Sequence, residues 1–151
     1  MRRFLTCLAW VLLAWSATIP GSLFGPDDWF DQLARPSWMP PGWVFGVVWS
    51  VLYTLMGIAA WMVWDKGEGR QRPLTLWGVQ LVLNAAWTPL FFGARQIFPA
   101  LILIAVLWFV LLTTILAFRR ASGIAAALLL PYLVWITIAT ALNFEIWRLN
   151  S

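Results

Sequence analysis

The residues with the clearest chemical potential are aromatic rings placed inside long apolar stretches. Trp49 and Tyr53 are one helical turn apart in a charge-free segment, and with Met56 and Ala60 they share one face of a helix. Indole and phenol rings prefer the wet interface of a membrane to its middle, so a lipid-facing helix gives no reason for them here. We therefore expect them to face a site inside the protein, where they would stack on a flat ligand.

Two other apolar segments carry comparable stripes. They are Gln80, Asn84 and Trp87 in one segment, and Trp135, Ala139 and Leu142 in the other, with Tyr132 and Asn143 on its flank. Together the three stripes outline an apolar, tryptophan-lined cavity in which one or two amides orient a small molecule. The competing interpretation is that the rings fill an ordinary helix bundle and that the buried amides hold its helices together.

The sequence offers no conventional catalytic or metal-binding constellation. It has no histidine and a single cysteine, Cys7, which excludes an intrachain disulfide and a Cys/His metal cluster. No nucleophile with a base and no paired carboxylates can be assembled, so acid–base and metal-assisted hydrolysis lack support. We expect no metal site and no required cofactor.

The elements that must position these stripes are membrane spans. The chain is 62% hydrophobic and 11% charged, the composition of a protein whose solvent is mostly lipid. Its charged residues fall in clusters, which leave five apolar stretches of about 20 residues, long enough to cross a bilayer. The predicted spans are about 4–23, 42–64, 74–93, 96–118 and 122–147. We therefore predict an all-α membrane protein, a five-helix bundle in a single domain over residues 1–151.

The formal net charge of +4 indicates topology rather than nucleic-acid binding, because the basic residues lie beside span ends without interleaved aromatics. If loops alternate sides, one side carries Arg2, Arg3, Lys66, Arg70, Arg72, Arg119 and Arg120, and the other only Arg35, Arg95 and Arg148. The positive-inside rule then places the N-terminus in the cytoplasm, if the membrane is a bacterial inner membrane. The first residues also resemble a secretory signal peptide, but their apolar run continues past the usual length.

A polar loop of residues 24–41 joins the first two spans. Asp27 or Asp28 is placed to cap a short helix that continues through Ala34. Prolines at positions 36, 40 and 41 stiffen the end of the loop, and the next helix begins at Pro41 or Gly42. We interpret this loop as a lid over the bundle. The alternative is an interfacial aromatic belt formed by Trp29, Trp38 and Trp43.

Small residues and one proline predict how the spans pack. Gly78 and Ala85 lie on a different side of the third span from its aromatic stripe, and would permit close approach of another helix, such as one from a second subunit. Pro131 should kink the fifth span one turn before Trp135.

Several motifs, in order along the chain, carry a resemblance to a known family. They are Trp38-Met39-Pro40-Pro41-Gly42-Trp43-Val44-Phe45; Val48-Trp49 with Leu52-Tyr53; Gln80-Leu81 with Leu83-Asn84; Trp87-Thr88-Pro89-Leu90-Phe91-Phe92; and Pro131-Tyr132-Leu133-Val134-Trp135 with Ala139-Thr140 and Leu142-Asn143. In order and spacing this set resembles the TspO/MBR family, the translocator or tryptophan-rich sensory proteins. The resemblance covers nearly the whole chain.

The resemblance implies a fold, a ligand and a site. It implies a five-helix bundle, usually a homodimer, that binds porphyrins such as protoporphyrin IX and, in animal members, cholesterol and benzodiazepine-type drugs. The family's pocket lies beneath the first loop. Carried over by motif, its wall here would comprise Trp38, Trp49, Tyr53, Asn84, Trp87, Trp135, Ala139 and Leu142. Phe144 stands where animal members commonly have tyrosine in the cholesterol-contact pattern, which puts cholesterol binding in doubt.

Three functions remain open at this point. The first is a membrane receptor or sensor that binds a tetrapyrrole, in metal-free form because histidine, the commonest haem ligand, is absent. The second is light-dependent porphyrin degradation, which the resemblance implies for some bacterial members and which would use Trp49 and Trp135. The third is passive transport, since ionisable residues near the span ends give no support to coupled pumping.

Overall fold

The computed structural model describes residues 1–67 and 69–151, and within these ranges its regular elements are all helical. Glu68, which belongs to the predicted loop between the second and third spans, lies outside the described residues. Five helical segments are long and apolar enough to cross a membrane: Arg2–Leu23, Gly42–Asp65, Gln71–Gly93, Ile97–Ala121 and Gly123–Asn150. The predicted all-α, five-span architecture is confirmed.

The described residues form ten helical elements, nine of which build the spans. The first span consists of α1 (Arg2–Trp15), a 3₁₀ turn η1 (Ser16–Thr18) and α2 (Ile19–Leu23), and the loop after it contains α3 (Asp28–Gln32). The second span is α4 (Gly42–Asp65), and the third is α5 (Gln71–Thr88) continued by a π-helical turn η2 (Pro89–Gly93). The fourth is α6 (Ile97–Ala121), and the fifth consists of α7 (Gly123–Leu128) and α8 (Leu130–Asn150).

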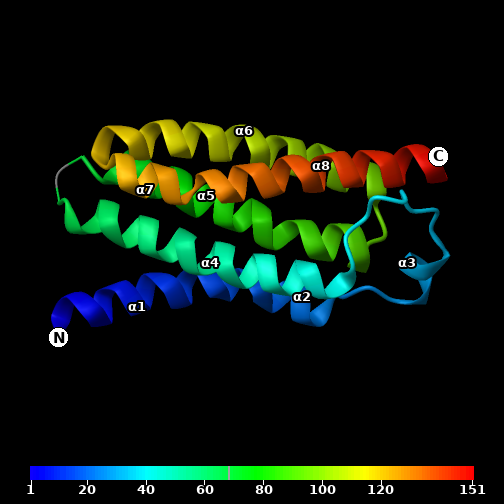
Figure 1. Cartoon of the computed structure of the whole chain (residues 1–151), viewed down its shortest axis with the longest axis horizontal. Helices are drawn as coiled ribbons and strands as arrows, with labels where there is room; N and C mark the ends of the chain where they lie inside the picture. The colour runs from blue at the N-terminus through cyan, green and yellow to red at the C-terminus, as the bar shows by residue number, and fades with distance from the viewer. Residues whose placement is uncertain (68) are drawn as a thin grey trace.

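The long helices lie side by side along one axis (Figure 1). Helix α1 packs on α4, α5 packs on α6, and α6 packs on both α7 and α8, while α4 contacts α7. The N-terminus and the α4–α5 connection lie at one end of the bundle, and the C-terminus and α3 lie at the other (Figure 1). The loop predicted to be a lid therefore lies at the C-terminal end of the bundle.

Helices α1 and α4 cross at Gly57 with almost no space between their backbones. A Cβ atom built on Gly57 would lie 2.4 Å from the Cα of Val11 and 2.9 Å from the carbonyl oxygen of Trp10. Both atoms belong to backbone, so no side-chain rotation can make room. Close backbone approach of this kind is how small residues join helices in lipid, where the hydrophobic effect offers no drive.

Three local predictions can be compared with the structure. The break that Pro131 predicts is present, since α7 ends at Leu128 and Pro131 lies in the first turn of α8. The short lid helix is capped by Asp27, as predicted, but it ends at Gln32 and does not continue through Ala34. The reason is that Leu33 adopts an extended backbone, with a ψ of 140°. Helix α4 begins at Gly42, directly after Pro41.

Candidate ligand-binding site

Three helices meet at a chain of hydrogen bonds in the core of the bundle. The hydroxyl of Tyr53 on α4 donates to Oδ1 of Asn84 on α5 over 2.7 Å. The Nδ2 of Asn84 in turn donates to the hydroxyl oxygen of Tyr132 on α8 over 2.9 Å. All three side chains are buried. This Tyr53–Asn84–Tyr132 triad joins α4, α5 and α8 without a formal charge, which suits a site inside a membrane.

Aromatic rings surround the triad. Trp49 stacks on Tyr53, with ring centroids 5.3 Å apart and planes 25° from parallel. The same indole meets the ring of Tyr132 edge-on, at 6.0 Å and 67°. Trp135 is buried and packs edge-on against Phe45 at 5.4 Å, and its Nε1 is buried without a hydrogen-bond partner among the described residues. Two of the predicted tryptophans thus lie in one core cluster with the triad tyrosines.

A second amide positions the third tryptophan. The Nε1 of Trp87 donates to Oδ1 of Asn143 over 3.1 Å, and the Nδ2 of Asn143 donates to the carbonyl oxygen of Ile97 over 3.1 Å. Trp87 also stacks on Phe91, with centroids 4.9 Å apart and planes 21° from parallel. Because indole, amide and phenyl are all fixed by partners, this face of α5 is held in place toward α8.

The lid covers a smaller apolar cluster at the C-terminal end of the bundle. That cluster consists of Phe30 from the lid together with Phe91, Ala100, Leu142 and Ile146. Trp29, Leu33 and Met39, also from the loop, pack against it. The loop is thus seated on the bundle through its apolar side chains, as expected of a lid.

Polar contacts fasten the lid at two points. Asp27 caps α3 by accepting the N–H of Phe30, and its other oxygen pairs with Arg95 at 2.9 Å. Slight desolvation tends to raise the pKa of Asp27, but these hydrogen bonds and the positive charge of Arg95 together hold that pKa below its ordinary value. At the other point, Ala34 and Asn150 exchange two hydrogen bonds of 2.9 Å, one in each direction.

An apolar groove of about 260 Å³ lies between α4 and α8. Its lining is Val47, Val48, Val51, Leu52, Pro131, Val134, Trp135 and Ile138. Val51 and Val134 are exposed on the outside of the bundle, whereas Leu52 and Trp135 belong to the core. The groove therefore leads from the lipid-facing surface to one of the predicted site tryptophans.

Not every predicted site residue joins these clusters. Trp38 is 49% exposed, whereas Tyr53, Asn84, Trp135 and Leu142 are buried. Trp49, Trp87 and Ala139 are partly buried and pack against the larger core cluster. The rings of this group pack mainly on one another and on the triad, and of these rings Trp135 lines the α4–α8 groove. Their role in binding stays a prediction.

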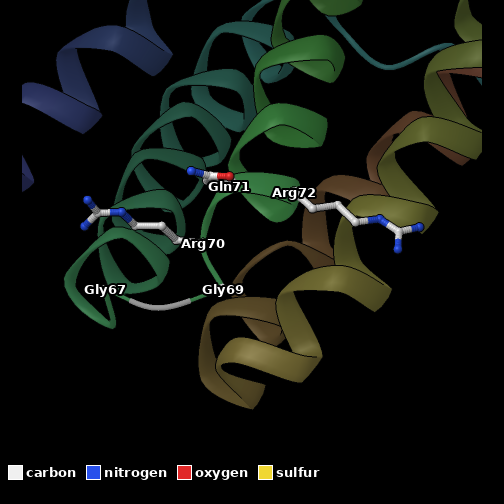
Figure 2. A pocket seen from close by; sticks show the side chains of 5 residues that line it. All are labelled: Gly67, Gly69, Arg70, Gln71 and Arg72. Carbon is white, nitrogen blue, oxygen red and sulfur yellow. The ribbon is translucent and has the colours of Figure 1, made fainter.

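A hollow at the opposite end of the bundle has a different character. It lies in the connection between α4 and α5 and is lined by Gly67, Gly69, Arg70, Gln71 and Arg72 (Figure 2). The side chains of Arg70 and Arg72 point in opposite directions, so they do not converge on one ligand (Figure 2). The guanidinium of Arg70 instead lies 3.8 Å from the centroid of the Trp64 ring. This hollow contains none of the predicted site residues.

Some partners of the site were not assigned by sequence reasoning. Tyr132 and Asn143 appeared only as flanking residues of a stripe, yet each accepts a hydrogen bond from a predicted site residue. Phe30 and Phe91 belong to the apolar cluster between the lid and the bundle. The available signal was the placement of an amide or phenol beside a tryptophan stripe, since such groups need partners when buried in lipid.

Comparisons with known proteins find similar sequences over most of the chain. A family model described as the TspO/MBR family matches residues 4–148. The tryptophan-rich sensory protein of Cereibacter sphaeroides is 44% identical over 130 residues, covering 86% of this chain and 82% of that protein. The translocator protein of Homo sapiens is 43% identical over 126 residues, covering 81% and 75%. Protein CrtK of Rhodobacter capsulatus is 39% identical over 133 residues, covering 86% and 83%.

Proposed function

The chain belongs to the TspO/MBR family, and on that premise we propose that it is a multi-pass membrane receptor for porphyrins, with protoporphyrin IX as the representative ligand. Other flat hydrophobic molecules fit the same chemistry. Its role would be regulatory or would lie in tetrapyrrole handling. No cofactor is required, because the porphyrin is the ligand. Phe144 makes a sterol the weaker candidate.

One observation carries the proposal above the others. Indole and phenol rings from α4 and α8 gather around the uncharged amide of Asn84, which sits between two tyrosine hydroxyls 2.7 Å and 2.9 Å away. Large rings supply stacking surface, and the amide and hydroxyls supply orientation. A tetrapyrrole arriving from the lipid phase would enter by the α4–α8 groove, since Trp135 lines it. A porphyrin bound there would replace the contacts between aromatic rings with contacts between those rings and its own ring.

The test is a titration of the purified protein in lipid nanodiscs with protoporphyrin IX, followed by porphyrin absorbance. We expect saturable binding, weakened at least tenfold by Trp49→Phe or Trp135→Phe, a loss of about 1.4 kcal/mol or more. The matched control is Trp43→Phe, because Trp43 is 72% exposed. Linear, non-saturating partition of porphyrin in the wild-type protein would reject the proposal.

A second candidate function is light-dependent porphyrin degradation. The observation that favours it is the stacking of the oxidisable Trp49 on Tyr53, with the phenol hydrogen-bonded to Asn84. Such a pair would give an electron to the excited porphyrin and be left as an indole radical, while dioxygen from solution would be the oxidant that opens the ring. Illumination of the complex should then bleach the porphyrin band, and Trp49→Phe with Trp135→Phe should stop the bleaching while a dark sample stays unchanged. Bleaching at the wild-type rate in the double variant would exclude these residues.

Assembly and orientation complete the proposal. A homodimer would form through the Gly78 and Ala85 face of α5, since a Cβ on Gly78 would meet no atom within 4 Å in the single chain. Crosslinking of a cysteine placed at Val82, which is 68% exposed on α5, tests this.

We place the protein in a bacterial cell membrane, with the N-terminus and the basic α4–α5 connection in the cytoplasm. Labelling of cysteines at the two ends from outside intact cells would check the orientation.

A further inference from the structure

The core of the bundle contains an amide that the ligand site does not use. Gln80 lies on α5 one turn before Asn84, and its side chain is completely buried, with an exposure of 0%. Neither its Nε2 nor its Oε1 has a hydrogen-bond partner among the described residues. A glutamine amide has two N–H donors and a carbonyl acceptor. An amide left unpaired in an apolar core is costly, and native structures rarely leave one so.

The neighbouring triad has an unmet group of its own. Tyr53 donates its proton to Asn84, and Asn84 donates to the oxygen of Tyr132, so the proton of Tyr132 still needs an acceptor. Rotating the Asn84 amide by half a turn would reverse both bonds, because the nitrogen and oxygen would exchange places. The unmet proton would then belong to Tyr53. Either orientation leaves one phenolic O–H without an acceptor among the described hydrogen bonds.

These unmet groups are connected through α5, because Gln80 is one helical turn from Asn84, which bonds both tyrosines. Residues four apart on a helix lie one above the other, which places Gln80 beside Asn84 on the face of α5 that points into the bundle. The larger core cluster of the bundle, which includes Asn84's partners Tyr53 and Tyr132, is apolar apart from such groups, and Met56 and Leu111 are fully buried in it. The indole N–H of Trp77 is already bonded to the carbonyl of Met56 at 3.1 Å. Lipid provides no hydrogen bonds at this depth.

We infer that Gln80 and the tyrosine hydroxyl beside Asn84 bind one or two water molecules inside the bundle. Water is the ligand that fits, because it accepts the phenolic proton and donates to the Gln80 carbonyl while accepting from the Gln80 amide. A charged ligand would lack a counter-charge, as the ionisable groups lie near the span ends. The water extends the Tyr53–Asn84–Tyr132 triad to Gln80, and this hydration site does not depend on porphyrin binding.

The direct test is nuclear magnetic resonance of the ligand-free, full-length protein in nanodiscs, measuring magnetisation transfer from water to side-chain amides. The Gln80 amide is assigned by its disappearance in Gln80→Leu. We expect transfer to Gln80 comparable with that to Gln71, which is exposed. The negative control is Asn143, which is buried and whose amide is bonded to protein groups on both sides. Transfer to Gln71 without transfer to Gln80 would overturn the inference.

Thermal unfolding gives an independent check. Gln80→Leu should lower the Tm by about 2–8 °C, because leucine cannot hold the water and the phenolic proton then has no acceptor. Combining it with Tyr132→Phe and Tyr53→Phe should recover part of the loss, since no phenolic proton then needs an acceptor. A Tm equal to or above that of the wild type in Gln80→Leu would mean that the amide was dry, and would contradict the inference. Porphyrin titration of the same variant reports separately on the proposed function.

Discussion

Helix α4 meets two of its neighbours, α1 and α8, in opposite ways. On the α1 side, the backbones touch at Gly57, where even a methyl group would strike the backbone of Val11 at 2.4 Å. On the α8 side, an apolar groove of about 260 Å³ separates the helices. There the connection is made by side chains, through the Phe45–Trp135 ring pair and the bonds of Asn84 to two tyrosines.

The difference indicates which side of the bundle can change shape. Backbone contact between α1 and α4 cannot be loosened without losing the dispersion energy of the whole crossing. Side chains can change rotamer, so the α4–α8 side can admit a flat ring by exchanging one aromatic contact for another. Helix α4 is thus fixed on its α1 side, while its α8 side can rearrange to admit a ligand.

The largest effect on stability is expected where α4 touches α1, because the two backbones leave no space there. Gly57→Val should destabilise the protein by about 3 kcal/mol or more, because the added carbons meet backbone that cannot shift locally. Thermal unfolding in detergent measures the effect. The matched control is Gly46→Val on the same helix, where an added Cβ meets nothing within 4 Å. Equal stability of the two variants would remove the distinction between the two sides of α4.

The next largest effect is expected from the hydrogen bonds that Asn84 makes to Tyr53 on α4 and Tyr132 on α8. Asn84→Leu should cost about 1–2 kcal/mol, since it removes two buried hydrogen bonds and leaves two phenols unpaired. Tyr53→Phe should cost less. The double variant should cost less than the sum of the two single losses, because both remove the same bond. Strict additivity in thermal unfolding would show that Asn84 and Tyr53 stabilise the bundle independently.

Much of this arrangement can be predicted from the sequence, and the limits are physical. Hydropathy predicts the five spans, and helical spacing predicts that Asn84 and Trp87 face inward, because both depend on local sequence. Which helices become neighbours depends on packing, so the bond from Asn84 to Tyr132 could not be assigned beforehand. Gly57 gives no local signal, since a single glycine in an apolar helix looks the same whether its Cα meets a backbone or lipid.

A smaller effect on stability is expected from filling the groove. Val134→Phe should change the free energy of unfolding by less than about 0.5 kcal/mol, because the side chain is 60% exposed. It should nevertheless slow porphyrin association, since it narrows the proposed entry between α4 and α8. Stopped-flow mixing of nanodiscs with protoporphyrin IX measures the rate. Val106→Phe on α6 adds the same bulk at an exposed side chain that does not line the groove, and an equal slowing there would refute entry between α4 and α8.

The smallest effect concerns the lid, which joins α2 to α4 at the C-terminal end. Because the pKa of Asp27 is lowered in the folded protein, its contribution is present at neutral pH and is lost as pH falls through that lowered value. Asp27→Asn should therefore expose the lid to protease slightly more at pH 7. The difference from wild type should shrink as the pH falls below about 4 and disappear once the pH lies below the lowered pKa. Asp28→Asn serves as the control, and identical digestion of all three proteins at pH 7 would contradict the tether.

The tether has a consequence for how freely one turn can vary. Arg95 has a φ of 56°, a left-handed conformation that suits glycine better than any residue with a side chain. Yet its guanidinium also pairs with Asp27 at 2.9 Å, a contact that glycine cannot make. Two properties therefore oppose each other at this position, the easier bend that glycine would give before α6 and the ion pair that holds the lid, so a change that relaxes the backbone also releases the lid.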